Sequence, residues 1–129
     1  MNGNYILDTN IIIALFNEEE HVLRRIEETD AIYLPIIVVA ELLYGASCSA
    51  RKEINLKRIN AFLSQNAILD CDVHIAKRFA AVKVELRQNG TPIPDHDIWI
   101  AALALHHRLT LVTRDSHFAN ILGLDILSW

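Results

Sequence analysis

The chain has 129 residues, of which 52% are hydrophobic, and this size and composition suit one domain with its own core. Asp and Glu number 16 against 12 Lys and Arg, giving a formal net charge of −4 that disfavours a protein which passively coats nucleic acid. A nucleic-acid enzyme stays open, because carboxylates that hold divalent cations add negative charge that the bound metal offsets. We therefore expect a single domain over residues 1–129 with one functional site.

The sequence carries no signal for a membrane or for secretion. No run approaches the ~18 apolar residues of a membrane span, and the first residues lack the basic segment and apolar core of a signal peptide. Cys48 and Cys71 have the spacing of neither a zinc site nor a secreted disulfide framework, so we predict two reduced, buried thiols. We expect a soluble cytoplasmic protein without a membrane partner.

The first half of the chain alternates short apolar runs with helical patterns. Its predicted elements are, in order, a strand at 5–7, helices at 11–16 and 18–28, a strand at 31–34 and a helix at 36–46. Pro35 suits the first turn of the last of these helices, and Gly45 lies near its end. The β-branched run at 36–39 makes a strand an alternative there.

The second half continues this alternation. Its predicted elements are a helix at 51–64, a strand at 67–69, a helix from Asp72 to Asn89 and Gly90, a helix from Asp95 or His96 to about Arg108, and strands at 109–113 and 125–127. Residues 91–94 are predicted to form a loop. Strands that alternate with helices predict an α/β fold, namely a three-layer domain whose central, mainly parallel sheet is flanked by helices.

Two acidic residues follow predicted strands. Asp8 ends the first strand, and Asp115 comes just after the strand at 109–113. Ligands gather at the carboxyl ends of parallel strands, so both side chains would point into one crevice. Each also has a structural explanation, since Asp8 could cap the helix at 11–16 and Asp115 could form an Asx turn.

Two further acids stand in unusual settings. Glu41 lies within an apolar run at 36–44, with no Lys or Arg within a helical turn. Burying an unpaired carboxylate is unfavourable, so Glu41 is expected to have a cation or a hydrogen-bond partner. Asp97 lies just inside the helix that follows Pro94, where the helix dipole alone would also favour it.

Asp8, Glu41, Asp97 and Asp115 together form a candidate metal site. Carboxylates brought together without cations repel by about 4 kcal/mol per pair at ~4 Å with an effective dielectric of ~20, and a divalent cation reverses this repulsion. Mg²⁺ and Mn²⁺ favour oxygen ligands and keep bound waters, which suits the activation of a water and the neutralisation of charge on a phosphate. We therefore predict a Mg²⁺ site, with Mn²⁺ as the alternative ion.

The remaining acids and the histidines have structural explanations. Asp70, Asp72 and Asp95 are interpreted as structural, with Asp95 best placed to reach the metal's surroundings indirectly. The histidines lack zinc-site spacing and are expected to be solvated or packed; they are His21, His74, His96, His106, His107 and His117. Only His96, beside Asp97, is a candidate to support a metal ligand.

Four short segments carry the four candidate acids in order along the chain. They are LDTN at 7–10, VAELLYG at 39–45, DIWIAA at 97–102 and LVTRD at 111–115. Together they resemble PIN-domain ribonucleases, specifically the VapC-type toxins of type II toxin–antitoxin systems, and the likeness spans nearly the whole chain. Asn10 matches a position where this family usually has Ser, Thr or Asn, and Thr113 matches one that often has a small hydroxyl residue.

The resemblance implies a PIN fold, Mg²⁺- or Mn²⁺-dependent cleavage of RNA, neutralisation by a cognate antitoxin and a homodimer. It assigns Asp8, Glu41, Asp97 and Asp115 as metal ligands or as organisers of a metal-bound water. In the mechanism that follows, the metal lowers the pKa of a bound water and stabilises the developing charge, leaving a 5′-phosphate and a 3′-hydroxyl.

Two sets of basic residues are candidates to bind the RNA backbone, and solvated helix faces are the alternative for each. The sets are Arg51, Lys52, Lys57 and Arg58, and Lys77, Arg78, Lys83 and Arg87.

Two other functions stay open. A metal-dependent phosphatase could use Asp8 as a covalent nucleophile. Asn10, however, stands where haloacid-dehalogenase-type phosphatases have a second Asp. A catalytically silent protein could keep the fold and bind an antitoxin-like partner. RNA cleavage that a chelator abolishes would separate the nuclease from both alternatives.

Overall fold

A parallel sheet forms the centre of the computed structural model, which describes residues 3–129. Five strands lie in the order β3-β2-β1-β4-β5, and every neighbouring pair is parallel. The strands are β1 (Asn4–Leu7), β2 (Ala31–Pro35), β3 (Ala67–Leu69), β4 (Thr110–Val112) and β5 (Ile126–Leu127). The predicted parallel α/β sheet is thus confirmed.

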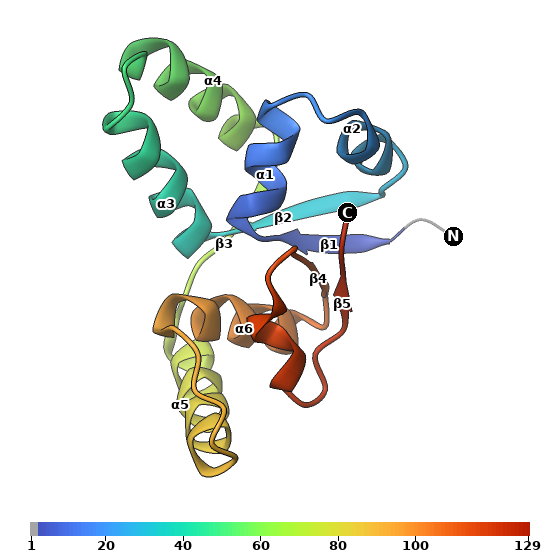
Figure 1. The fold of residues 1–129 in the computed structure, drawn as a ribbon, viewed down its shortest axis with the longest axis vertical. Coiled ribbons are helices and arrows are strands. Elements are labelled where there is room, and N and C mark those ends of the chain that lie inside the picture. Colours follow the sequence, from blue (N-terminus) through green and yellow to red (C-terminus); the bar gives the residue numbers. More distant parts are fainter. Residues whose placement is uncertain (1–2) are drawn as a thin grey trace.

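Helices cover the sheet from both sides. They are α1 (Thr9–Phe16), α2 (Glu20–Glu27), α3 (Ile36–Ser47), α4 (Lys52–Ser64), α5 (Val73–Gln88) and α6 (Asp95–His107), with a short 3₁₀ helix, η1 (Ser116–Asn120). Figure 1 shows α1 to α4 on one side of the sheet and α5 and α6 on the other. The three-layer prediction is confirmed.

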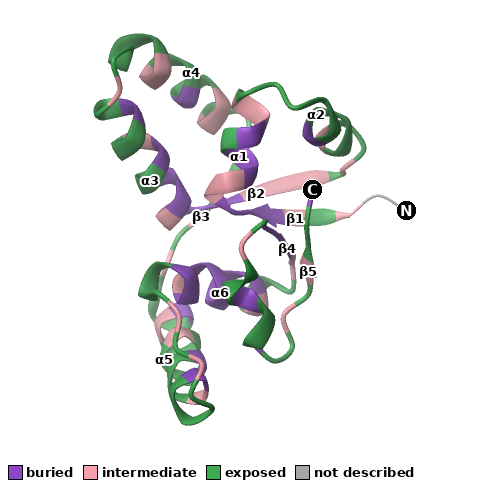
Figure 2. Ribbon diagram, viewed as in Figure 1, coloured by how far each residue is buried: buried purple, intermediate pink, exposed green. Residues whose placement is uncertain are grey.

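The core centres on the two middle strands. Ile6, Leu7, Leu111 and Val112 are completely buried, so β1 and β4 are held between layers of apolar side chains. Helix α6 is buried over most of its length, as Figure 2 shows, because its sequence is apolar on nearly every face. Packing of this kind holds the ends of β1, β4 and α6 in fixed relative positions.

Helix α3 begins directly after Pro35, so the strand alternative for residues 36–39 is wrong. Val38, Val39, Leu42 and Ala46 recur at helical spacing and bury one face of α3, which offsets the weak helix propensity of the β-branched run.

Helix α2 starts at Glu20, two residues later than predicted. Glu18 takes a left-handed backbone conformation with φ of 58°, and the extended Glu19 is the N-cap, so neither residue can belong to the helix.

Asp72 caps α5 as predicted, since its carboxylate accepts hydrogen bonds from the backbone N–H groups of His74 and Ile75 at 2.9 and 3.1 Å. Gly90, with φ of 72°, follows the end of the same helix.

The two cysteines differ from the expectation of buried thiols. Cys48 is exposed, because it follows the last turn of α3, beyond the last residue that this helix buries. Cys71 is half-buried, and burial raises the pKa of its thiol. Among residues 3–129, no helix is both long and apolar enough to cross a membrane.

Candidate active site

The candidate site lies where the strand order reverses. From β1 the chain proceeds outward to β2 and β3, then crosses back to place β4 on the other side of β1. The carboxyl ends of β1 and β4 therefore flank a topological switch point, the usual ligand crevice of an open parallel sheet. Asp8 directly follows β1, and Asp115 follows β4 by three residues. The predicted convergence of strand ends is observed.

Asp8 is buried and held by hydrogen bonds on both carboxylate oxygens. It is the N-cap of α1, and Oδ1 accepts from the backbone N–H of Thr9 at 2.8 Å. Oδ2 accepts from the Thr113 hydroxyl at 2.7 Å and from the Asn10 amide at 3.3 Å. The side chain thus serves as the predicted cap and is also fixed at the crevice.

Thr113 joins the two strand ends. Its hydroxyl donates to Asp8 and accepts from the backbone N–H of Asp115 at 3.0 Å. It lies 2% exposed, and the backbone N–H of Thr113 donates to the carbonyl of Leu127 at 2.9 Å, extending the sheet. One buried hydroxyl therefore couples the positions of two candidate acids.

Asp97 enters the site from the opposite layer. It lies in the first turn of α6, whose N-cap is Pro94, and its side chain is only 4% exposed. Two histidines contact its carboxylate: His96 Nε2 is 3.2 Å from Oδ1, and His117 Nδ1 is 3.1 Å from Oδ2. The helix N-terminus and these two imidazoles compensate for part of the burial of Asp97.

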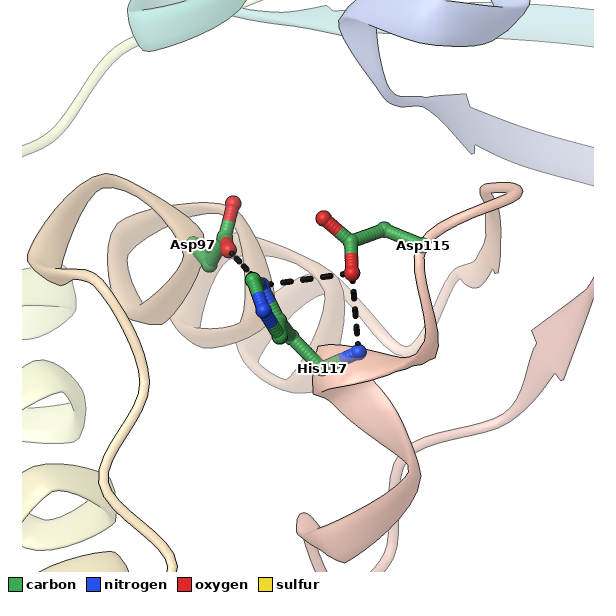
Figure 3. A group of neighbouring side chains, drawn as sticks. All are labelled: Asp97, Asp115 and His117. Atoms are coloured by element: carbon green, nitrogen blue, oxygen red, sulfur yellow. Dashed lines mark hydrogen bonds and ion pairs between the residues drawn. The ribbon is translucent and has the colours of Figure 1, made fainter.

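Asp115 and His117 belong to one short turn. Asp115 is the N-cap of η1, and its Oδ1 accepts from the backbone N–H of His117 at 2.9 Å. The same oxygen lies 3.2 Å from His117 Nδ1, so the imidazole stands between Asp115 and Asp97 (Figure 3). The predicted Asx-type capping of Asp115 is present together with its position in the cluster.

The electrostatics of this cluster suit a cation. Burial raises the pKa of Asp8 above its ordinary value of 3.8, although hydrogen bonds from Thr113 and Thr9 oppose the shift. The negative charges of Asp97 and Asp115 raise this pKa further. Asp97, Asp115 and His117 each bring a ligand atom within 4.8 Å of the others. Several carboxylate oxygens that repel one another are suitable ligands for a hard divalent ion.

Glu41 differs from the expectation, because it is exposed on α3 and is not a buried acid. Val38, Val39, Leu42 and Ala46 face the core, while Glu41 lies on the exposed face of the helix with Ala40 and Tyr44. Its Oε1 accepts from the Thr9 hydroxyl at 3.1 Å. Thr9 therefore connects Glu41 to the site, since its backbone N–H also binds Asp8.

Asp95 does not join the cluster. Its side chain is 61% exposed and pairs with Lys83 at 2.9 Å on the outer surface of α5 and α6. His96 contacts Asp97, as the sequence predicted for this residue. His117 was expected to be solvated or packed, and its place between two of the acids is the main feature that the sequence analysis missed.

An open groove runs beside Glu41 between α1, α3 and α4, with a volume of about 260 Å³. Thr9 and Glu41 line it, and Arg58 lines it further along. The guanidinium of Arg58 donates to the carbonyl of Phe16 at 2.6 Å and lies 4.7 Å from the centre of the Phe16 ring. Arg58 is thereby held at the groove.

The chain matches known proteins over almost its full length. The model of the PIN domain family matches residues 5–123. A protein of Rickettsia felis named ribonuclease VapC2 is 33% identical over 130 residues, covering 97% of both chains. A protein of Salmonella typhimurium named tRNA(fMet)-specific endonuclease VapC is 34% identical over 128 residues, again covering 97% of both chains.

Solved structures agree with these matches. VapBC2 from Rickettsia felis, bound to a DNA fragment from its promoter, contains a chain with a TM-score of 0.90 and 32% identity, covering 98% of both chains. DNA-bound VapBC from Salmonella typhimurium contains one with a TM-score of 0.91 and 33% identity, covering 100% of this chain and 99% of that one. The chain belongs to the PIN-domain family and, within it, to the VapC ribonucleases.

Proposed function

We propose that this protein is a metal-dependent endoribonuclease and the toxin of a type II toxin–antitoxin pair. The observation that carries the proposal is the convergence of Asp8, Asp97 and Asp115 at the switch point of the sheet, in a chain of the VapC family. Relatives named as ribonucleases support RNA as the substrate. Asp8 supports the nuclease over a phosphatase, because an acid that is 6% exposed and hydrogen-bonded on both oxygens is a poor nucleophile.

Asp8, Asp97 and Asp115 are the proposed metal ligands, with Mg²⁺ as the expected ion and Mn²⁺ as the alternative. Glu41 would bind the metal or orient a water from the opposite wall of the crevice, since it is exposed yet tied to Thr9. When bound, such a cation makes water a stronger acid and neutralises charge that develops on the phosphate.

The protein's own contribution is to fix the acids before the substrate arrives. Thr113 and the N–H of Thr9 hold the Asp8 carboxylate in one orientation, while His96 and His117 hold the two oxygens of Asp97. Groups that are already oriented lose little freedom when the reaction begins, which is how positioning lowers a barrier.

The groove beside Glu41 supplies a route for the RNA backbone. Arg58 lines this groove and would contact a phosphate, and the other basic residues of α4 would add longer-range attraction. The name of the Salmonella relative makes tRNA(fMet) the first RNA to test. The proposal includes a cognate antitoxin, a homodimer and a cytoplasmic location, where RNA and antitoxin would be met.

The proposal is tested by RNA cleavage with Mg²⁺ present and with EDTA in its place. Asp97→Asn should lower cleavage on the order of 100-fold or more, because a buried ligand is replaced by a neutral amide of the same shape. Asp125→Asn, at an exposed position directly before β5, is the matched control and should cleave normally. The products should carry 5′-phosphate and 3′-hydroxyl ends.

Four outcomes would overturn the proposal. A correctly folded Asp97→Asn variant with unchanged cleavage would remove the assigned role of the acid. Cleavage that persists in EDTA would remove the metal. A phosphorylated Asp8 during phosphate-ester hydrolysis would favour the phosphatase, and the absence of any cleavage would favour a silent antitoxin-binding protein.

A further inference from the structure

His117 directs one ring nitrogen into the acidic cluster. Its Nδ1 lies 3.1 Å from Asp97 Oδ2 and 3.2 Å from Asp115 Oδ1, and the ring stands between the two carboxylates (Figure 3). The backbone of His117 is fixed as well, since its N–H donates to Asp115. In the described part of the chain, Nε2 of this ring has no hydrogen-bond partner, so it is free to carry the ring hydrogen when Nδ1 binds something else.

The distances from His117 Nδ1 to the two carboxylate oxygens match neighbouring positions around one ion. In an octahedral complex with bonds of about 2.1 Å, adjacent ligand atoms are about 3.0 Å apart. The distances from Nδ1 to the two carboxylate oxygens fall close to that value, and the three ligand atoms lie within 4.8 Å of one another. A cation could therefore bind all three atoms with only small movements of the side chains.

The chemistry of the imidazole ring decides which cation it binds more tightly. Mg²⁺ prefers oxygen ligands and gives up its waters reluctantly, so an imidazole in place of a water or carboxylate adds little to its binding. First-row transition metals accept imidazole nitrogen more readily than Mg²⁺ does, and Mn²⁺, which itself favours carboxylates, can bind one imidazole beside them. An imidazole beside the carboxylates should thus distinguish Mn²⁺ from Mg²⁺ more strongly than carboxylates alone would.

We propose that His117 is a metal ligand through Nδ1 and that it shifts the preference of the site from Mg²⁺ toward Mn²⁺. This inference rests on the proposed function, because it needs a divalent ion at Asp97 and Asp115. It adds a fifth residue to the four predicted acids and raises the affinity of the site for Mn²⁺ relative to Mg²⁺.

His96 provides a matched comparison. It contacts the other oxygen of the same carboxylate, Asp97 Oδ1, at 3.2 Å and is about as exposed as His117, at 51% against 49% for the side chains. Unlike His117, it is absent from the group of closely spaced ligand atoms found among the described residues. Replacing either histidine removes one imidazole beside Asp97, but only His117 should bind the ion.

The experiment measures Mn²⁺ and Mg²⁺ binding to wild-type protein, His117→Asn and His96→Asn by calorimetry. Pulsed electron paramagnetic resonance of the Mn²⁺-loaded proteins reports directly coordinated ¹⁴N. We expect a ¹⁴N signal in wild type and His96→Asn that disappears in His117→Asn, with Mn²⁺ affinity falling at least about tenfold and Mg²⁺ affinity changing far less. Thermal melts in EDTA confirm that the variants are folded.

The outcomes separate the inference from the proposed function. Mn²⁺ that binds wild-type protein without a ¹⁴N signal overturns the His117 assignment and leaves the acidic metal site in place. A signal that survives His117→Asn and is lost in His96→Asn gives the role to His96 instead. If neither ion binds wild-type protein, then both the inference and the metal-dependent function fail.

Discussion

Replacing Asp115 by Asn should make the metal-free protein more stable. Ligand atoms of Asp97 and Asp115 lie within 4.8 Å, and two unit charges at that distance repel by about 0.9 kcal/mol in water and about 3.5 kcal/mol at an effective dielectric of 20. Asp97 is 4% exposed and Asp115 32%, so solvent screens the pair only in part. His117, placed between them, softens the repulsion. We expect a gain of about 1 to 2 kcal/mol, or about 4 to 8 °C in Tm for a chain of this length.

The assay is thermal unfolding in EDTA and in excess Mg²⁺. Asn keeps the oxygen that accepts from the backbone N–H of His117, so the capping of η1 should survive. The matched control is Asp72→Asn, the same change at another helix cap. Hydrogen bonds from Ile75 and His74 hold the pKa of Asp72 below its ordinary value, so its ionised form stabilises the fold and the control should lower Tm.

In excess Mg²⁺ the wild type should have a higher Tm than Asp115→Asn, the reverse of the result in EDTA. The wild type binds the ion with the full set of acids, and the Asp115→Asn variant does not. A Tm in EDTA that is unchanged or lower in Asp115→Asn would refute the argument that the acids repel one another and need a cation.

Three more changes test individual contacts. The raised pKa of Asp8 means that the folded state holds this proton more tightly, so wild-type stability without metal falls as pH rises from 3.8 through the folded pKa. Relative to wild type, Asp8→Asn should gain stability over that window in denaturant titrations, and a constant difference would contradict the shift. Thr113→Val removes the 2.7 Å hydrogen bond to Asp8 and should lower the free energy of unfolding by about 1 to 3 kcal/mol, whereas Thr113→Ser should not. Glu41→Gln should reduce RNA cleavage without changing Tm, because Glu41 is exposed; a large loss of stability would show that it is structural.

The fold was predictable because the spacing of apolar residues and the Pro, Gly and capping residues indicate the same helices and strands along the sequence. Pro35 and the buried positions of α3 define a helix even though its first residues favour a strand. Boundaries were harder where the backbone conformation of a single residue decides them. The left-handed Glu18, which ends the turn between α1 and α2, has no signal in its residue type, since Gly or Asn is the usual choice there.

The locations of some of the four acids were easier to predict from the sequence than those of others. Asp8 and Asp115 could be placed because the carboxyl ends of parallel strands meet at one edge of the sheet. Glu41 was found for a mistaken reason: an apolar neighbourhood in sequence does not bury a residue when the helix turns that residue outward. Its link to the site, through the Thr9 hydroxyl, depends on how α1 and α3 pack, and no local pattern encodes that packing.

His117 shows what a local pattern can reveal and where it stops. A capping Asp accepts from the backbone N–H two residues later, which holds the side chain of that residue close to the carboxylate. Asp115 and His117 have this spacing and this hydrogen bond at 2.9 Å, but so do Asp72 and His74 at the same distance. The spacing therefore selects both histidines. Only the packing of α6, which brings Asp97 within 3.1 Å of His117, turns one of them into a member of the site.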